Sequence, residues 1–175
     1  MAETALKVLG DELVRDVVRA EWIDINQHMN VAYYVLAFDL AIDALWERFG
    51  LGGEYFETRH GSTFAVESHI EYKRELLKGD PYIVTTQILA FDEKRIHQFM
   101  RMYHAEQGYL AATSEWMNLH VNIRERKVTP WPESILGRIS EFVAGQDQRI
   151  YSEDAGKTMH IKKPLYRADA NREST

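Results

Sequence analysis

A short polar stretch near the start of the chain carries residue types that catalysis commonly uses. It runs from Asp24 to Asn30 with the order Asp-Ile-Asn-Gln-His-Met-Asn, and a long apolar segment begins at Val31. If that segment is a helix, its first backbone N–H groups present partial positive charge to the polar stretch. This arrangement suits the stabilisation of negative charge that develops on a substrate oxygen.

The individual groups of this stretch leave several roles open. Asp24 is a candidate general base or nucleophile, although an aspartate in a loop is more often a turn residue. His28 and Asn30 can orient water, position Asp24 or fix the loop. Asn30 is also of the type that caps the start of a helix. Backbone N–H groups from Met29 to Ala32 are the candidate oxyanion donors.

The segments that follow have clear periodicity. Apolar residues recur every three or four positions over residues 31–49, which predicts a helix. Gly50, Gly52 and Gly53 are expected to end this helix. Four strand-like runs, separated by short breaks, then predict an antiparallel meander. The runs cover residues 64–72, 82–91, 96–104 and 109–123, with a further strand expected at 13–19 and a short helix at 133–143.

These elements predict an α+β fold. A helix that is apolar on most of its faces must be wrapped, and a curved antiparallel sheet closing around one helix, the hot-dog arrangement, achieves this. We expect one domain over residues 1–144. The remaining residues 145–175 form a polar tail that is expected to be poorly ordered.

Composition excludes several classes of function. A formal net charge of -6 disfavours general nucleic-acid binding, and no apolar run has the length of a membrane span. No signal peptide is recognisable at the start, so a cytoplasmic protein is expected. The absence of cysteine excludes thiolate chemistry, and the seven histidines lack ligand spacing. We therefore expect neither a metal nor another cofactor.

Several motifs together resemble a known family. Asp24-x-Asn26-x-His28-Met29-Asn30 followed by Tyr33 is similar to the signature of hot-dog acyl-CoA thioesterases of the 4-hydroxybenzoyl-CoA thioesterase type. One departure is Val31, where many relatives have a second asparagine. The resemblance covers roughly residues 13–140 and continues through Glu67-x-x-Ile70-x-Tyr72, Gly79-Asp80, Asp92-x-Lys94-Arg95-Ile96 and Leu119-His120-Val121.

The run Ala111–Val121 supports a narrower resemblance. It is similar to thioesterases of carnitine breakdown, which act on betainyl-CoA. A quaternary ammonium substrate is expected to meet an aromatic face. The aromatic candidates are Trp22, Tyr33, Tyr34 and Trp116.

The resemblance implies an acyl-CoA thioesterase without a cofactor. Asp24 is then the base or nucleophile, and Asn26, His28 and Asn30 complete the catalytic set. Glu67 supports the site from a partner subunit, unless it is only a solvated acid. The other substrate-binding candidates are Tyr33, Lys73 and Arg74, of which Lys73 and Arg74 either meet the CoA phosphates or are strand-edge charges that oppose aggregation.

One other function remains open at this point, because a non-catalytic acyl-CoA or acyl-carrier binding protein can use the same cleft. Hot-dog folds also host dehydratases, but these rely on histidine with aspartate or glutamate in different contexts, and no such pattern is present here. The resemblance further implies a homodimer or a dimer of dimers, with sites built between subunits. Strand alternation agrees, because it places Met117 and Leu119 against the helix and leaves Trp116 on the outer face, where it suits an interface.

Overall fold

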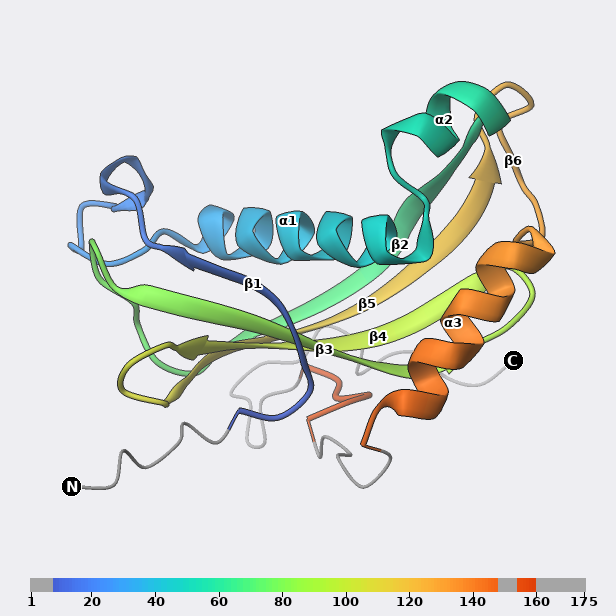
Figure 1. The fold of residues 1–175 in the computed structure, drawn as a ribbon. Coiled ribbons are helices and arrows are strands. Elements are labelled where there is room, and N and C mark those ends of the chain that lie inside the picture. Colours follow the sequence, from blue (N-terminus) through green and yellow to red (C-terminus); the bar gives the residue numbers. More distant parts are fainter. Residues whose placement is uncertain (1–7, 148–153, 160–175) are drawn as a thin grey trace, which may run out of the picture.

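A strongly curved antiparallel sheet holds one long helix in its hollow (Figure 1). The computed structural model describes residues 8–147 and 154–159. The helices are α1 (Val31–Phe49), α2 (Gly53–Arg59) and α3 (Glu133–Gly145), with a 3-10 turn at Ala20–Trp22. The strands are β1 (Asp11–Val17), β2 (Gly61–Tyr72), β3 (Pro81–Phe91), β4 (Arg95–His104), β5 (Leu110–Asn122) and β6 (Lys127–Val128).

The strand order corrects the predicted four-strand meander. The order is β1-β3-β4-β5-β2, with β6 also pairing with β5, so only β3, β4 and β5 follow one another. Strand β2 pairs with β5, for example Ile70 with Ser114. The connection over residues 73–80 is long enough to cross the end of the sheet, and β1 takes the place beside β3. Strand β2 therefore forms a free edge within the described chain.

Helix α1 has the bounds that its periodicity predicts. Asn30 caps its start, with the side-chain Oδ1 accepting a hydrogen bond from Ala32 N. Gly50 ends it in the left-handed conformation at φ 77°, which glycine adopts without strain. The other two glycines do not end α1, because Gly52 caps helix α2 and Gly53 is its first residue.

The core lies between α1 and the sheet. Phe38, Ala41 and Leu45 of α1 are fully buried, as are Met100 and Ala112 of the sheet. The opposite face of α1 is not covered, since Val35, Leu36 and Leu40 are exposed. Among the described residues, no helix is both long and apolar enough to cross a membrane.

Helix α3 closes one end of the core. Phe142 of α3 packs edge-on against Phe49, with ring centroids 5.5 Å apart. Just before α3, the Trp131 ring packs near that of Trp46, with ring centroids 6.4 Å apart. The C-terminal end of α1 is therefore enclosed by aromatic rings, and this fixes where α3 lies.

The faces predicted for Trp116, Met117 and Leu119 of β5 are reversed. Trp116 is only 7% exposed and belongs to the core, whereas Met117 and Leu119 are half-buried on the outer face. Alternation divides a strand into two faces but does not say which one is buried. Two polar groups on the inner face have partners there: the Trp116 indole N–H donates to the Ser114 hydroxyl, and His120 bonds Tyr55 Oη. The interface role expected of Trp116 was wrong for this reason.

Part of the expected tail lies against the sheet. Gln146 is buried and pairs with the backbone of Ile88, its amide nitrogen donating to the carbonyl at 2.7 Å. Residues 154–159 lie at the outer face, where Gly156 N donates to Glu115 Oε2 at 2.8 Å. The rest of the tail, and the first seven residues, lie outside the described residues.

Candidate active site

The polar stretch forms a closed loop ahead of α1. Asp24 N donates to His28 O at 3.1 Å and Ile23 bridges to Met29, so the two ends of the loop pair as a short hairpin. Gln27 takes the left-handed conformation at φ 66°, which turns the chain. Met29 N donates to Leu76 O at 2.8 Å, and Asn30 N donates to Trp22 O at 2.9 Å. These bonds hold the loop in a fixed position at the start of α1.

Asp24 and His28 come together within this loop. Asp24 Oδ2 lies 3.7 Å from His28 Nδ1. Asp24 Oδ1 accepts a hydrogen bond from Asn26 N at 2.8 Å, which orients the carboxylate. The Asp24 side chain is 18% exposed and that of His28 is 33% exposed. The carboxylate is thus shielded by its loop but still reachable, with an imidazole beside it.

Only one backbone N–H group of the predicted oxyanion set is available. Met29 N and Asn30 N are bonded to carbonyls, and Ala32 N is capped by Asn30 Oδ1 at 3.0 Å. In the described part of the chain, Val31 N has no hydrogen-bond partner. Val31 is the first residue of α1 and is 54% exposed. The positive end of the helix therefore presents a single N–H donor.

A hollow of about 230 Å³ opens beside this donor. His28 and Val31 line one side of it, and Tyr72 and Arg74 line the side that belongs to the end of β2. Tyr34 is buried at its inner wall, where it accepts a hydrogen bond from Leu76 N at 3.0 Å. Its ring meets that of Tyr72 edge-on at 5.3 Å. Burial raises the pKa of Tyr34 to about 12, so its hydroxyl stays neutral.

The two cations predicted to meet phosphate differ in their surroundings. The Arg74 guanidinium lies over the Tyr109 ring at 3.9 Å, and no carboxylate of the described residues pairs with it. Lys73 Nζ instead bonds Glu71 at 2.7 Å and Asp154 at 3.3 Å. Burial alone would lower the pKa of Lys73, but these bonds outweigh it and raise the pKa. Arg74 is the freer of the two cations.

The remaining predicted residues lie elsewhere. Asn26 is exposed at the tip of the loop between Asp24 and His28. Tyr33 stacks on Trp22, with ring centroids 5.5 Å apart, outside the hollow. Glu67 is exposed in the middle of β2 and lines a different surface hollow, which also contains His97. Within one chain, His28, Lys73 and Arg74 therefore line one hollow and Asp24 lies beside His28, whereas Glu67 and Tyr33 do not line it.

Sequence reasoning missed two residues of this hollow. The sequence marks Tyr72 only as part of a motif and gives Glu75 no distinguishing feature, yet both line the hollow. Both residues flank Lys73 and Arg74 in the sequence, and this position was the signal that could have identified them as part of the site. The described residues contain no group of three or more histidine, aspartate or glutamate side chains placed to hold a metal ion.

Comparison with known proteins gives a consistent result. The family model described as the Thioesterase-like superfamily matches residues 18–139. A betainyl-CoA thioesterase from Pseudomonas aeruginosa is 31% identical over 144 residues, covering 82% of this chain and 91% of that protein. A Rhizobium meliloti protein named L-carnitine dehydrogenase/betainyl-CoA thioesterase is 34% identical over 151 residues, or 86% of this chain. This chain matches about 30% of the length of that two-function relative.

A solved structure shares the architecture. A Staphylococcus aureus protein in complex with CoA superimposes with a TM-score of 0.82 and 29% identity. The match covers 89% of this chain and 98% of that protein. The curved sheet, the long helix and the order of the elements are thus those of a known fold.

Proposed function

The chain belongs to the thioesterase-like superfamily, and we propose that it hydrolyses a small acyl-CoA, betainyl-CoA in particular, to the free acid and CoA. The observation that carries this proposal is that the Asp24 carboxylate lies beside His28, which lines the same hollow as Val31, the residue whose N–H has no partner among the described residues. Similarity to betainyl-CoA thioesterases supports the choice of acyl group.

In the proposed reaction Asp24 supplies the attack on the thioester. It either takes a proton from a water molecule whose oxygen attacks the carbonyl carbon, or attacks that carbon itself. The carbonyl oxygen gains negative charge and accepts a hydrogen bond from Val31 N. The C–S bond then breaks, and the CoA thiolate leaves and takes up the proton that Asp24 received from the water. If Asp24 attacks directly, a water molecule then hydrolyses the Asp24 acyl anhydride, which releases the acid, restores the carboxylate and supplies the proton taken up by the thiolate. His28 positions Asp24 or the water.

The walls of the hollow suit the two ends of such a substrate. Arg74 is exposed and free to bind a phosphate of CoA, and the guanidinium geometry favours this pairing. The Tyr34 and Tyr72 rings offer aromatic surface to a quaternary ammonium group, with the Glu75 carboxylate nearby. A volume of about 230 Å³ favours a small acyl group.

A dimer completes the proposal. Residues Phe64–Ser68 of the free β2 edge are exposed, and a long apolar edge strand is a site for pairing with another chain. In antiparallel pairing of two copies, the end of one β2 lies beside the start of the other. Because Tyr72 ends β2 and lines the hollow, each site would then be completed by the partner.

The test is CoA release from a panel of thioesters, followed with a thiol reagent. The panel contains betainyl-CoA, 4-hydroxybenzoyl-CoA, and short and medium fatty acyl-CoAs. The protein has no cysteine, so it adds no background. Preferred turnover of betainyl-CoA is expected. Preference for another thioester would reject the acyl assignment, and tight binding without any turnover would favour the non-catalytic binding protein.

A further inference from the structure

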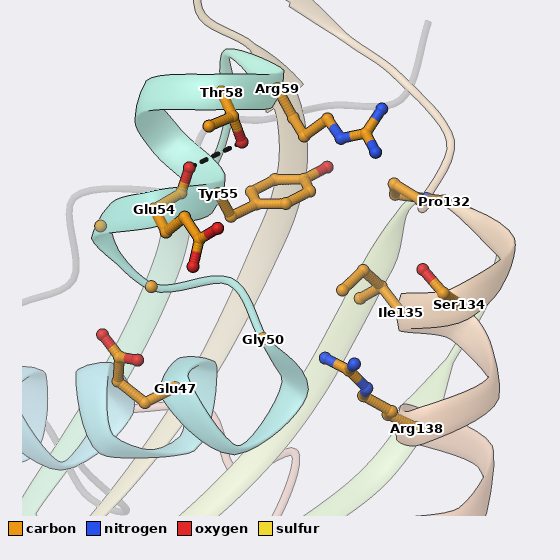
Figure 2. Close-up of a pocket in the computed structure, with 12 residues that line it drawn as sticks. Glu47, Gly50, Glu54, Tyr55, Thr58, Arg59, Pro132, Ser134, Ile135 and Arg138 are labelled. Atoms are coloured by element: carbon orange, nitrogen blue, oxygen red, sulfur yellow. Dashed lines mark hydrogen bonds between the residues drawn. The ribbon is translucent and has the colours of Figure 1, made fainter.

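A second and larger hollow lies at the other end of α1. It is a cleft of about 590 Å³ between the C-terminal end of α1, helix α2 and the start of α3 (Figure 2). The 19 residues of α1 separate it from the Asp24 loop within the chain. At about 1.5 Å per residue, that separation is on the order of 28 Å. The cleft is therefore a feature distinct from the candidate active site of the same chain.

Charges of opposite sign line opposite parts of this cleft. Glu47 of α1 and Glu54 of α2 lie on one side, while Arg138 projects into the cleft from α3 (Figure 2). Arg59, at the end of α2, points across the cleft toward Pro132. Among the described residues, Glu47, Glu54 and Arg59 form no ion pair. Within the described part of the chain, Arg138 Nη1 donates to the Phe49 carbonyl, at 2.9 Å, and to no other group.

The charged walls are built into the fold. A Cβ atom at Gly50 would collide with the Arg138 guanidinium, and one at Gly52 would collide with the Glu47 carboxylate. The two glycines thus leave the space in which these side chains rest. The Tyr55 ring lies in the cleft, and its hydroxyl bonds His120 Nε2 at 3.0 Å, which ties α2 to β5. This bond holds the α2 wall of the cleft in place.

We propose that this cleft binds a small zwitterion, a molecule with an ammonium group at one end and a carboxylate at the other. The ammonium group is placed at Glu47 and Glu54, beside the Tyr55 ring, which also attracts cations. The carboxylate is placed at Arg59 and Arg138. A simple anion would lie close to two unpaired carboxylates, and a simple cation would lie close to two guanidinium groups. Only a zwitterion can therefore pair with the charges of both walls.

Betaine, the acid released in the proposed reaction, belongs to this class. Binding of betaine here would let the product act on its own enzyme, and this part of the inference rests on the proposed function. The binding site itself does not depend on hydrolysis.

Calorimetric titration of the full chain with glycine betaine tests the proposal. Acetate and tetramethylammonium serve as probes of each charge alone. The exposed side chains of Arg59 and Glu54 allow Arg59→Gln and Glu54→Gln without loss of a described hydrogen bond, while Asp24→Asn alters only the candidate active site. Saturable betaine binding is expected, weakened at least tenfold in each cleft variant and unchanged in Asp24→Asn. Acetate and tetramethylammonium should bind at least tenfold more weakly.

Three results would overturn the proposal. They are the absence of saturable betaine binding, equal binding of acetate, and binding that is lost in Asp24→Asn but kept in Arg59→Gln. The last result would place betaine in the candidate active site. Since the titration needs no turnover, an inactive protein that still binds betaine in the cleft would reject the proposed hydrolysis and retain this site.

Discussion

At the start of α1, the proposed stabilisation of the oxyanion depends on a single backbone N–H group. The Asn30 side chain accepts a hydrogen bond from Ala32 N. Met29 N and Asn30 N donate to the backbone carbonyls of Leu76 and Trp22. Among the candidate donors from Met29 to Ala32, Val31 N alone has no hydrogen-bond partner in the described part of the chain, and Val31 lines the hollow. Many relatives have asparagine where this chain has Val31. This difference changes only the side chain, whereas the proposed oxyanion donor is the backbone N–H group of Val31.

Replacement of Val31 by proline tests this assignment. Proline lacks the N–H group but fits the first position of a helix. It requires an extended preceding residue, and Asn30 already has φ -66° and ψ 142°. We expect Val31→Pro to lower kcat by about 10²- to 10³-fold with little change in the thermal midpoint. Val31→Ala, which keeps the N–H, should retain most of kcat. Equal activity of the two variants would exclude Val31 N as the oxyanion donor.

At the scale of elements, α2 depends on a buried histidine. His120 Nε2 accepts from the Tyr55 hydroxyl, and Nδ1 donates to the backbone carbonyls of Thr129 and Pro130, each at 3.0 Å. Burial lowers the pKa of His120 below its usual value of 6.5, against the opposing effect of the two carbonyl bonds. The folded protein therefore holds this imidazole neutral at a pH where the unfolded chain already binds a proton.

Stability should consequently depend on pH through His120. As pH falls below about 6.5, the unfolded chain takes up a proton that folded His120 resists, so stability falls until the folded pKa is reached. In thermal unfolding between about pH 7 and pH 5, His120→Gln should show a smaller decrease of the midpoint than the parent. His69→Gln, the same exchange on the outer face, should keep the parent slope. Parallel slopes for all three proteins would contradict this account.

Periodicity identified most elements but not their arrangement. The bounds of α1 were predictable because its apolar spacing is regular and Asn30 and Gly50 mark its ends. The place of β2 beside β5 was not, since pairing between distant strands leaves no local pattern. The burial of Trp116 was missed because alternation does not identify the inner face.

The candidate site was predictable to a similar extent. Asp24 and His28 lie four residues apart, so one loop brings them together. The separation of Glu67 from this region was not predictable, because it depends on the curvature of the sheet and on which edge β2 occupies. The cleft near Gly50 gave no local signal, since its walls come from three helices.

For the whole molecule, the free β2 edge predicts self-association. Val66 is 56% exposed on this edge, and a lysine there should oppose pairing with a second copy. We expect light scattering to show a dimer for the parent and a monomer for Val66→Lys. Val128→Lys, an equivalent change on the exposed strand β6, should remain dimeric. A Val66→Lys protein of unchanged mass would exclude pairing through this edge.

The central claim is that the Asp24 carboxylate drives thioester hydrolysis, and single-turnover hydrolysis of betainyl-CoA by Asp24→Asn tests it most directly. Asparagine keeps the shape and the hydrogen bond from Asn26 N but neither accepts a proton nor attacks as a carboxylate. We expect hydrolysis to fall by at least about 10²-fold and CoA binding to be retained. Asp39→Asn, on the exposed face of α1, should have no effect on either. Hydrolysis by Asp24→Asn at the parent rate would contradict the central claim.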